Sequence, residues 1–409
     1  MKAASLWTKN FTILTLGSAV SMIGNAVSGF AISLLMLDKT GSVFLYALFL
    51  AAYNLPKIIL PLVAGPFLDN RSRRKTIFTL DFISASIFLL MFFIIKSGFF
   101  SYPLFLLLVI VIGSVDSVYY VAYDSLFPIL VSEGNFTKAY SVASLLEPIA
   151  TIMVPIAAVV YNTVGLAPLF LVNAISFLVA AICETQIKVE EAHTLKKTSS
   201  LTFAYLKDEL VGGLKYINRE KGLKTITSYF FLNAVSGMGA YSLNMPYFKS
   251  VPSLGVMAYS YSMASNVTGR LAGGLLHYRF KYPVKKKFAI ALTVYTAISF
   301  IEGGVLYTPL FIMLPLFFLD GIMGVTSYNI RLSTTQSYVP NDMRGRFNGV
   351  FQMVCNAGTV VGTLLAGALA EFLPIRPVVT GLMVINLIAA FAIMFRGRRE
   401  VAKIYNRDV

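Results

Sequence analysis

The sequence predicts an all-α integral membrane protein, with twelve transmembrane helices in two parallel six-helix repeats and both termini in the cytoplasm. Three observations support this prediction: the composition, the spacing of apolar runs and an internal repeat. Of 409 residues, 57% are hydrophobic and only 13% are charged, and the mean hydropathy is +0.73. So few charges cannot cover the surface of a water-soluble protein of this length. The chain is therefore expected to lie in a membrane.

The apolar runs predict the number and order of the helices. A helix that crosses a bilayer needs about 20 mostly apolar residues. Runs of this kind lie at residues 11–36, 43–68, 76–95, 102–124, 139–163, 166–186, 223–248, 253–279, 286–306, 308–331, 346–372 and 374–396. We expect one membrane-spanning helix in each run. The first run is too long for a cleavable signal peptide, and it lacks a small-residue cleavage site.

The distribution of basic residues predicts the orientation of these helices. With a cytoplasmic N-terminus, 28 of the 34 Lys and Arg residues fall in inner segments and 4 in outer loops. Cytoplasmic loops collect Lys and Arg, so this excess places both termini inside. The net charge of +15 is thus explained by orientation, and no nucleic-acid partner is expected.

An internal repeat relates the two halves of the chain. At an offset of 208 residues, the pentapeptide NAVSG at 25–29 recurs at 233–237, and Gly113 recurs as Gly321. Because each half holds six spans, an even number, the halves run parallel and are related by an axis along the membrane normal.

The repeat also predicts the domain organisation. We expect an N-terminal six-helix bundle at residues 1–186, a cytoplasmic linker at 187–222, and a C-terminal six-helix bundle with a basic tail at 223–409. Within the linker, apolar residues recur at helical spacing from Phe203 to Ile217. This pattern predicts an amphipathic helix along the inner membrane surface, with a plain linker as the simpler interpretation.

Several functional classes are not supported by the sequence. No phosphate-binding loop of the G-x-x-x-x-G-K-[ST] type occurs, which argues against ATP-driven transport by this chain. Two cysteines and two histidines provide neither a disulfide framework nor a metal cluster. We therefore expect no enzymatic activity, no metal and no cofactor, and we expect a proton gradient to supply the energy.

The loop after the second apolar run carries a recognisable pattern. It contains Gly65, Asp69, Arg73 and Arg74. A glycine here permits close helix approach, and an aspartate can cap a neighbouring helix and pair with arginine. The loop resembles the signature loop of the major facilitator superfamily, although Asn70 and Ser72 depart from that signature. We interpret the motif as a cytoplasmic clamp that holds one access state; ordinary inner-loop charge would explain only its basic residues.

Other stretches narrow the resemblance. Residues 37–42 read LDKTGS, residues 209–217 read ELVGGLKYI, and residues 339–346 read VPNDMRGR. The chain is similar to the bacterial macrolide-efflux type of exporter, a group that includes siderophore exporters. In the third stretch, Arg344, Gly345 and Arg346 follow the turn at Pro340 and belong to the expected cytoplasmic gating motif.

Ionisable residues inside spans are expensive and usually face a cavity or a partner. The deepest in this sequence are Lys57, Asp116, Glu147, Arg270 and Asp320. The resemblance implies that the first, fourth, seventh and tenth spans line a cavity, which would place Asp116 and Asp320 there. One hypothesis is that Asp116, Asp320 and Glu147 couple proton entry to substrate exit. The other is fixed ion pairing of one acid with Lys57 or Arg270.

Other polar and charged residues in the spans are less decisive. Asp81 and Glu302 lie nearer helix ends, where pairing with interfacial groups explains them. Asn25 and Asn233 fall in the repeated pentapeptide, and they could bind substrate or join helices. Tyr120 and Tyr328, also related by the repeat, could contact an apolar ligand or simply pack.

Together these features predict a secondary transporter that works by alternating access. We expect it to export an amphipathic, drug-like or macrolide-like compound from a bacterial cell, as a monomer in the plasma membrane, with a small-molecule substrate and the lipid bilayer as its partners. The alternatives are uptake or export of another small solute such as a siderophore or metabolite, lipid translocation, and a non-transporting membrane receptor. A receptor would be expected to carry a long soluble domain, and only the segment 187–222 interrupts the spans.

Overall fold

The computed structural model describes residues 5–69, 71–132, 135, 138–139, 142–143, 146, 149–150, 152–189, 203–280 and 282–407. All regular elements of these residues are helices. They form two compact units. The first unit comprises the described residues of Met1–Thr40 and Ile59–Thr202, and the second those of Gly41–Ile58 and Phe203–Val409. Residues 41–58 thus belong with the second unit, whereas the sequence grouped them with residues 1–186.

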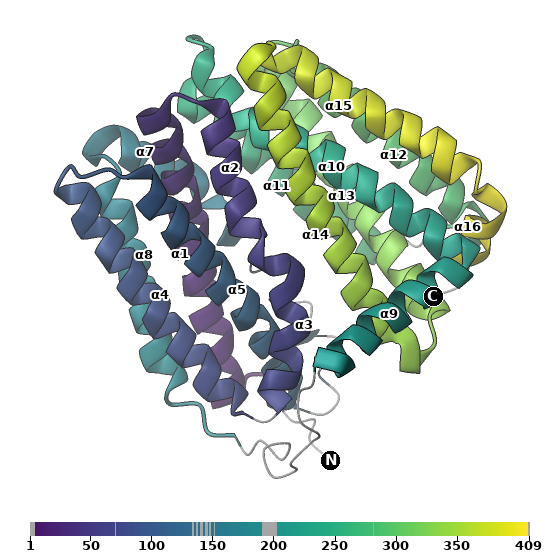
Figure 1. Cartoon of the computed structure of the whole chain (residues 1–409), viewed down its shortest axis with the longest axis horizontal. Helices are drawn as coiled ribbons and strands as arrows, with labels where there is room; N and C mark the ends of the chain where they lie inside the picture. Colours follow the sequence, from purple (N-terminus) through teal and green to yellow (C-terminus); the bar gives the residue numbers. More distant parts are fainter. Residues whose placement is uncertain are drawn as a thin grey trace. The chain divides into compact units, whose positions relative to one another are not determined.

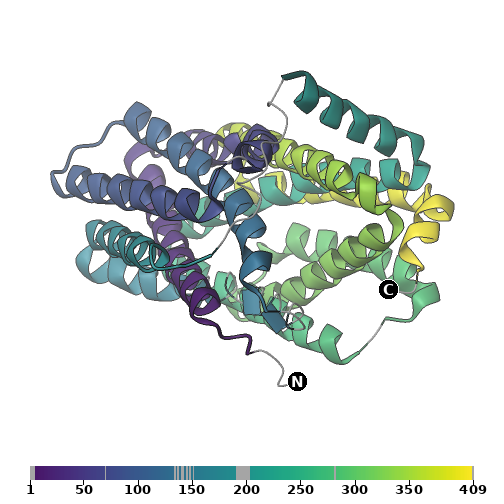
Figure 2. The ribbon, with the colours of Figure 1, turned by 90° about the horizontal axis from the view of Figure 1, so that it is seen from below.

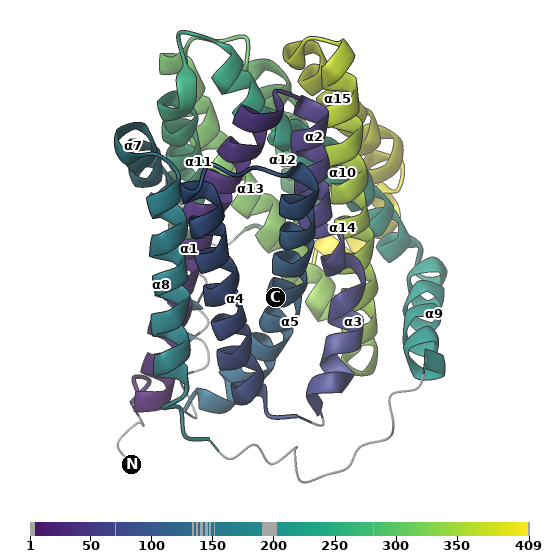
Figure 3. The same ribbon diagram turned by 60° about the vertical axis from the view of Figure 1, so that its left-hand side comes forward.

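The first unit is a bundle of long helices. It holds α1 (Lys9–Thr40), most of α3 (Pro56–Asp69), α4 (Arg73–Lys96), α5 (Tyr102–Leu130), α7 (Val154–Val164) and α8 (Ala167–Glu184). Helix α8 packs against both α1 and α4, and α5 packs against the same two helices (Figure 3). Ser72 begins α4, because its hydroxyl accepts a hydrogen bond of 3.2 Å from the amide of Lys75. This capping explains the serine at a position where the signature loop has glycine.

The second unit contains the remaining helices. These are α2 (Val43–Asn54), α9 (Phe203–Arg219), α10 (Lys221–Ser250), α11 (Gly255–Arg279), α12 (Lys287–Val305), α13 (Leu310–Tyr338), α14 (Asn341–Phe372), α15 (Ile375–Ala389) and α16 (Arg398–Tyr405), with a 3-10 turn at Val284–Lys286 and a π-helical segment at Ala390–Phe395. Helix α14 packs against α10 and α2 (Figure 1), and α11 packs against α13.

The second predicted span is divided in the structure. The run at 43–68 forms α2 and α3, which are separated at Leu55. The break follows from Pro56, because a proline has no amide hydrogen to continue the helical bonding. At the other end, the Ser42 hydroxyl caps α2 by accepting a 3.1 Å bond from the amide of Leu45.

In the described part of the chain, nine helices are long and apolar enough to cross a membrane. They correspond in order to nine of the twelve predicted spans. Of the other three, 223–248 and 253–279 coincide with the long helices α10 and α11. Both contain many Ser, Asn, Gly and Tyr residues, which lower their hydropathy. Within 139–163, the described residues include the shorter helix α7. The twelve-span topology and the cytoplasmic termini stay predictions.

Close backbone contact fixes α11 against α13. A Cβ atom added to Gly269 would lie 2.0 Å from the carbonyl oxygen of Phe318, and one added to Gly321 would lie 2.0 Å from that of Asn266. No side chain fits at such distances, so glycine permits this approach. The crossing places Asp320, the neighbour of Gly321, directly beside α11.

Two short helices pack onto the second unit. Helix α9 forms within the predicted linker, whose residues 190–202 lie outside the described residues, and it approaches α14 at Gly213. The predicted basic tail contains α16, which packs against α10, α12 and α13 and is yellow in Figure 2. The side chains of Val401, Ile404 and Tyr405 are buried there.

Candidate functional site

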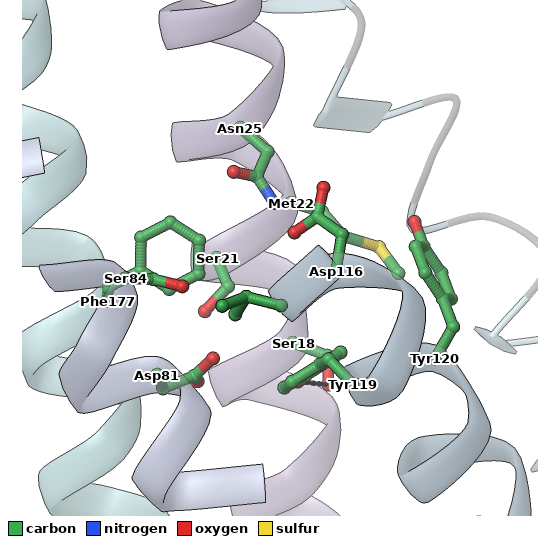
Figure 4. A pocket seen from close by; sticks show the side chains of 11 residues that line it. Ser18, Ser21, Met22, Asn25, Asp81, Ser84, Asp116, Tyr119, Tyr120 and Phe177 are labelled. Carbon is green, nitrogen blue, oxygen red and sulfur yellow. Dashed lines mark hydrogen bonds between the residues drawn. The ribbon is translucent and has the colours of Figure 1, made fainter. Parts of the chain in front are cut away.

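A small cavity lies within the first unit, between α1, α4, α5 and α8. Its volume is about 20 Å³, which is room for one water molecule. The oxygen-bearing side chains that line it are Ser18, Ser21, Asn25, Asp81, Ser84, Asp116, Tyr119 and Tyr120 (Figure 4). Among its described lining residues two are acidic and none is basic. The cavity therefore favours positive charge.

Three residues named by the sequence meet at this cavity. Asp116 of α5 is 8% exposed, and its carboxyl group points toward the amide of Asn25 on α1 (Figure 4). Tyr120 lines the same cavity but is 47% exposed, so its ring also reaches the surface of the first unit. The structure thus brings one predicted acid, one amide and one aromatic side chain together.

Two further acids lie in the same region, and sequence reasoning missed their importance. Asp81 of α4 is 1% exposed, and Glu184 at the end of α8 is fully buried. Their carboxyl groups are neighbours. The depth of Asp81 along its helix had suggested an interfacial position, but α8 covers it. Helix α1 also lies against Glu184, because a Cβ added at Gly17 would lie 3.2 Å from a Glu184 carboxyl oxygen.

Asp320 is held by an amide in the second unit. The Nδ2 atom of Asn266 on α11 donates a 2.8 Å hydrogen bond to its carboxyl oxygen Oδ2. Arg270, one turn further along α11, is exposed, and it attracts Asp320 electrostatically. Glu302 of α12 also interacts with Asp320. Asp320 therefore belongs to a polar cluster that includes Glu302, which the sequence had placed near a helix end.

Asn233 takes part in a hydrogen-bonded chain between helices. Its Nδ2 atom donates to Asn386 Oδ1 at 3.3 Å, and Asn386 donates to the hydroxyl of Ser299 at 3.1 Å. These bonds join α10, α15 and α12. Of the two interpretations that the sequence allowed for Asn233, the structure shows the bond between helices.

The aromatic and cationic residues of the second unit form contacts of their own. Tyr328 is 53% exposed. The guanidinium carbon of Arg331 lies 5.4 Å from its ring centre, 5.1 Å from that of Phe230 and 4.7 Å from that of Phe351. Three rings on α10, α13 and α14 thus surround one cation.

Lys57 lies at the start of α3. Its Nζ atom is 3.8 Å from the centre of the Tyr53 ring, and its carbonyl accepts a 2.9 Å hydrogen bond from Asn356 on α14. Glu147, the remaining predicted acid, lies outside the described residues.

The structure describes part of the motif that the sequence places at the cytoplasmic face. Arg73 donates to the carbonyl of Ser125 at 3.2 Å, and Arg74 donates to that of Ile187 at 2.5 Å. These bonds join the start of α4 to α5 and to the segment after α8. Gly65 and Asp69 lie in α3, and their side-chain surroundings are outside the described part.

The second part of the motif begins α14. Arg344 donates to the carbonyl of Val339 at 3.4 Å, and the Arg346 side chain lies beside α9, 3.5 Å from an added Cβ at Gly212. Gly345 has open space around it. The linker helix α9 therefore contacts one of the predicted gating arginines.

His277 stands where the repeat places the counterpart of Asp69. Its Nε2 atom lies 3.1 Å from the hydroxyl of Thr326, and its Nδ1 atom lies 3.1 Å from the amide nitrogen of Asn329. Both partners are on α13, so His277 joins α11 to α13.

Among the described residues, no group of three or more His, Cys, Asp or Glu side chains is arranged to hold a metal ion. Cys183 and Cys355 are free thiols.

Comparison with known proteins identifies what this arrangement is similar to. The family model described as Major Facilitator Superfamily matches residues 14–363. Macrolide efflux protein A of Streptococcus pyogenes is 22% identical over 384 residues, which is 91% of this chain and 92% of that protein. The uncharacterized MFS-type transporter YkuC of Bacillus subtilis (strain 168) is 24% identical over 299 residues, 71% of this chain and 69% of that protein.

Solved structures share the fold. The nucleoside transporter NupG superposes with a TM-score of 0.70 at 12% identity, covering 95% of this chain and 99% of that chain. A bacterial homologue of the iron transporter ferroportin gives 0.68 at 16% identity, with 97% and 100% covered. A bacterial homologue of the lysosomal transporter Spinster gives 0.69 at 14% identity, with 98% of both chains covered. At these identities the likeness shows the fold alone.

Proposed function

The chain belongs to the Major Facilitator Superfamily, and we propose that it exports an amphipathic small molecule of the macrolide type from a bacterial cell in exchange for protons. The observation that carries the proposal is the alignment with Macrolide efflux protein A, which extends over nearly the full length of both chains. A match of this extent covers both halves of the chain, so it favours a shared transport cycle over a shared fragment.

The buried acids support proton coupling. Asp116 and Asp320 lie on α5 and α13, and each has an amide-bearing neighbour, Asn25 and Asn266 respectively. Carboxyl groups inside a membrane domain are costly unless they serve an ion or substrate pathway. We infer that at least one of these acids takes up a proton and releases it as the two repeats alternate their access in the plasma membrane.

The proposal makes the chain a twelve-span, monomeric antiporter that needs no cofactor besides the proton gradient. The basic motif residues Arg73, Arg74, Arg344 and Arg346 would lie at its cytoplasmic face, as the charge distribution indicates. We propose that these residues stabilise one access state of the cycle.

Inverted membrane vesicles provide the test. Vesicles that contain the protein should accumulate a radiolabelled macrolide when a proton gradient is imposed, and an uncoupler should abolish the accumulation. At least one of the variants Asp116→Asn and Asp320→Asn should lose gradient-driven accumulation while its protein level stays unchanged. Asp124→Asn is the matched control, because Asp124 is an exposed acid on the same helix as Asp116.

Three outcomes would contradict parts of the proposal. Accumulation that persists in both variants would remove Asp116 and Asp320 from coupling. Uptake into right-side-out vesicles, without accumulation in inverted ones, would identify an importer. No transport of macrolides, with transport of another compound, would reassign the substrate.

A further inference from the structure

The pair formed by Asp81 and Glu184 is unusual in its surroundings. Both residues are almost fully buried. The carboxyl group of Asp81 on α4 is the neighbour of that of Glu184 on α8. One carboxyl oxygen of Asp81 and both of Glu184 lack a hydrogen-bond partner among the described residues. Buried oxygen atoms left in this state cost free energy unless a further group satisfies them.

We propose that Asp81 and Glu184 hold one proton between them and that this shared proton is the coupling ion of transport. Two adjacent buried carboxyl groups cannot both remain ionised at moderate cost, and one proton between them replaces the repulsion with a short O–H···O⁻ bond. The coupling role rests on the proposed function, whereas the shared proton does not.

The groups that face the pair do not supply a positive charge to balance its negative charge, so a proton would balance it. They are Ser21 from α1, Asp116, Tyr119 and Tyr123 from α5, and Cys183 from α8. The nearby arginines at the start of α4 donate to backbone carbonyls, Arg73 to Ser125 and Arg74 to Ile187. Acids and weakly acidic hydroxyl or thiol groups therefore dominate the surroundings.

The small cavity connects the pair to Asp116. Asp81 and Asp116 both line it, and the oxygen atoms of Asp81 and Ser21 point toward one another across its lower part (Figure 4). The cavity has room for one water molecule. Such a water would carry the shared proton to Asp116 by accepting it from Asp81 and donating one of its own. Asp116 then becomes neutral, both members of the pair become ionised until the next proton arrives, and the total charge of the three acids is unchanged.

This arrangement gives the acids different tasks. Asp116 would exchange protons with the bulk, and the Asp81–Glu184 pair would store the proton behind it. The storage site lies between α4 and α8, which pack against each other, and its two side chains are at most 1% exposed.

The shared proton can be tested without a substrate. Infrared spectra of the purified full-length protein at neutral pH should contain the C=O stretch of a protonated carboxylic acid. The difference between wild type and the Asp81→Asn/Glu184→Gln variant should show the loss of one such band. The control variant Asp208→Asn should show no loss, because Asp208 is exposed on α9, outside the predicted spans. An unchanged band in the double variant would overturn the proposal.

Each single variant serves as a check on folding. Asp81→Asn and Glu184→Gln keep the size of each side chain, and both should elute as the wild type does in size exclusion.

Binding of Na⁺ in place of the proton is tested by thermal unfolding. If the unfolding midpoint of the wild type rises with NaCl but not with choline chloride, and that of Asp81→Asn does not, the site binds Na⁺ and the shared-proton proposal is overturned.

A transport assay distinguishes failure of the shared-proton proposal from failure of the proposed export function. In vesicles, Asp81→Asn should lose accumulation driven by the proton gradient but retain exchange of labelled for unlabelled macrolide. Full gradient-driven accumulation in this variant would remove the pair from coupling and leave export intact. If the wild type transports no macrolide, the export proposal fails, and the infrared spectrum still decides whether the pair shares a proton.

Discussion

At the scale of single residues, two glycines determine how closely α11 and α13 approach. The added Cβ distances of 2.0 Å at Gly269 and Gly321 point to backbone carbonyls, which cannot move aside as a flexible side chain would. The neighbouring Gly324 has open space in the same helix. This difference allows a matched pair of substitutions.

We expect Gly321→Ala to destabilise the protein by about 1–3 kcal/mol, because the methyl group forces the two helices apart. Gly324→Ala should be neutral or stabilising by up to about 1 kcal/mol, since alanine favours a helix over glycine. Thermal unfolding of both variants in the same detergent measures the difference. Equal midpoints would show that the crossing is looser than described.

Asn173 provides a second test at this scale. It is fully buried on α8, donates a 2.6 Å bond to the hydroxyl of Ser28 on α1, and accepts one from Ser176. Asn173→Ala leaves these hydroxyls with fewer partners, so we expect a loss of about 1–3 kcal/mol in unfolding free energy. Ser86→Ala, at an exposed hydroxyl that bonds only within α4 in the described structure, should change it by less than about 0.5 kcal/mol.

The residues of the candidate site were only partly predictable. Asp116 and Asn25 could be named because each is polar in the middle of an apolar run. Asp81 and Glu184 lie about 100 residues apart in the sequence, near helix ends. Their meeting depends on the packing of α4 against α8, and one sequence carries no direct signal of which helices pack together.

At the scale of elements, α16 and the residues after it connect the end of the chain to α12 through hydrogen bonds. Its Tyr405 hydroxyl lies 3.0 Å from that of Tyr295 on α12. After it, Asn406 accepts from the amide of Phe288, and the carbonyl of Arg407 accepts from Lys287 at 2.7 Å. Burial raises the pKa of Tyr405 well above its usual value, so its phenol keeps the hydrogen that this contact requires.

We expect Tyr405→Phe to reduce the unfolding free energy by about 1 kcal/mol through loss of this bond. Tyr295→Phe should cost a similar amount, and the double variant should cost little more than either single one. Thermal unfolding of the wild type, the two single variants and the double variant completes this double-mutant cycle. Additive losses would show that the two hydroxyl groups act independently.

Most helix positions were predictable from the apolar runs in the sequence. The features that were not predicted have local causes. The break at Leu55 was missed because Pro56 and Pro61 stand in an otherwise continuous apolar run. Prolines are tolerated within membrane helices, so they do not by themselves mark an end. The amphipathic spacing predicted a helix at α9, but its glycine contact with α14 depends on the tertiary fold.

At the scale of the whole molecule, the 28 to 4 distribution of basic residues predicts a definite topology. Replacing Cys183 and Cys355 with alanine gives a background for single cysteines. We expect Ser97→Cys to react with a membrane-impermeant maleimide in intact cells, because it follows α4 on the predicted outer side. Lys207→Cys, which is exposed on α9, should react only after the cells are permeabilised.

The reverse labelling pattern would place the termini outside and would invert the assignment of the cytoplasmic motif. Labelling of both positions in intact cells would argue that α9 is accessible from outside. The six predicted spans in each repeat place both termini on the same side of the membrane, and the labelling decides which side that is.

The association of α2 with α14 has a consequence for how the chain is made. Glu371 near the end of α14 accepts hydrogen bonds from the Ser42 hydroxyl and, at 2.8 Å, from the amide of Phe44 at the start of α2. The ribosome synthesises α2 about 300 residues before α14. At roughly 5–20 residues per second, α2 waits on the order of 15–60 s for its partner. During that interval its surface must be covered by lipid, by the insertion machinery or by a temporary neighbour.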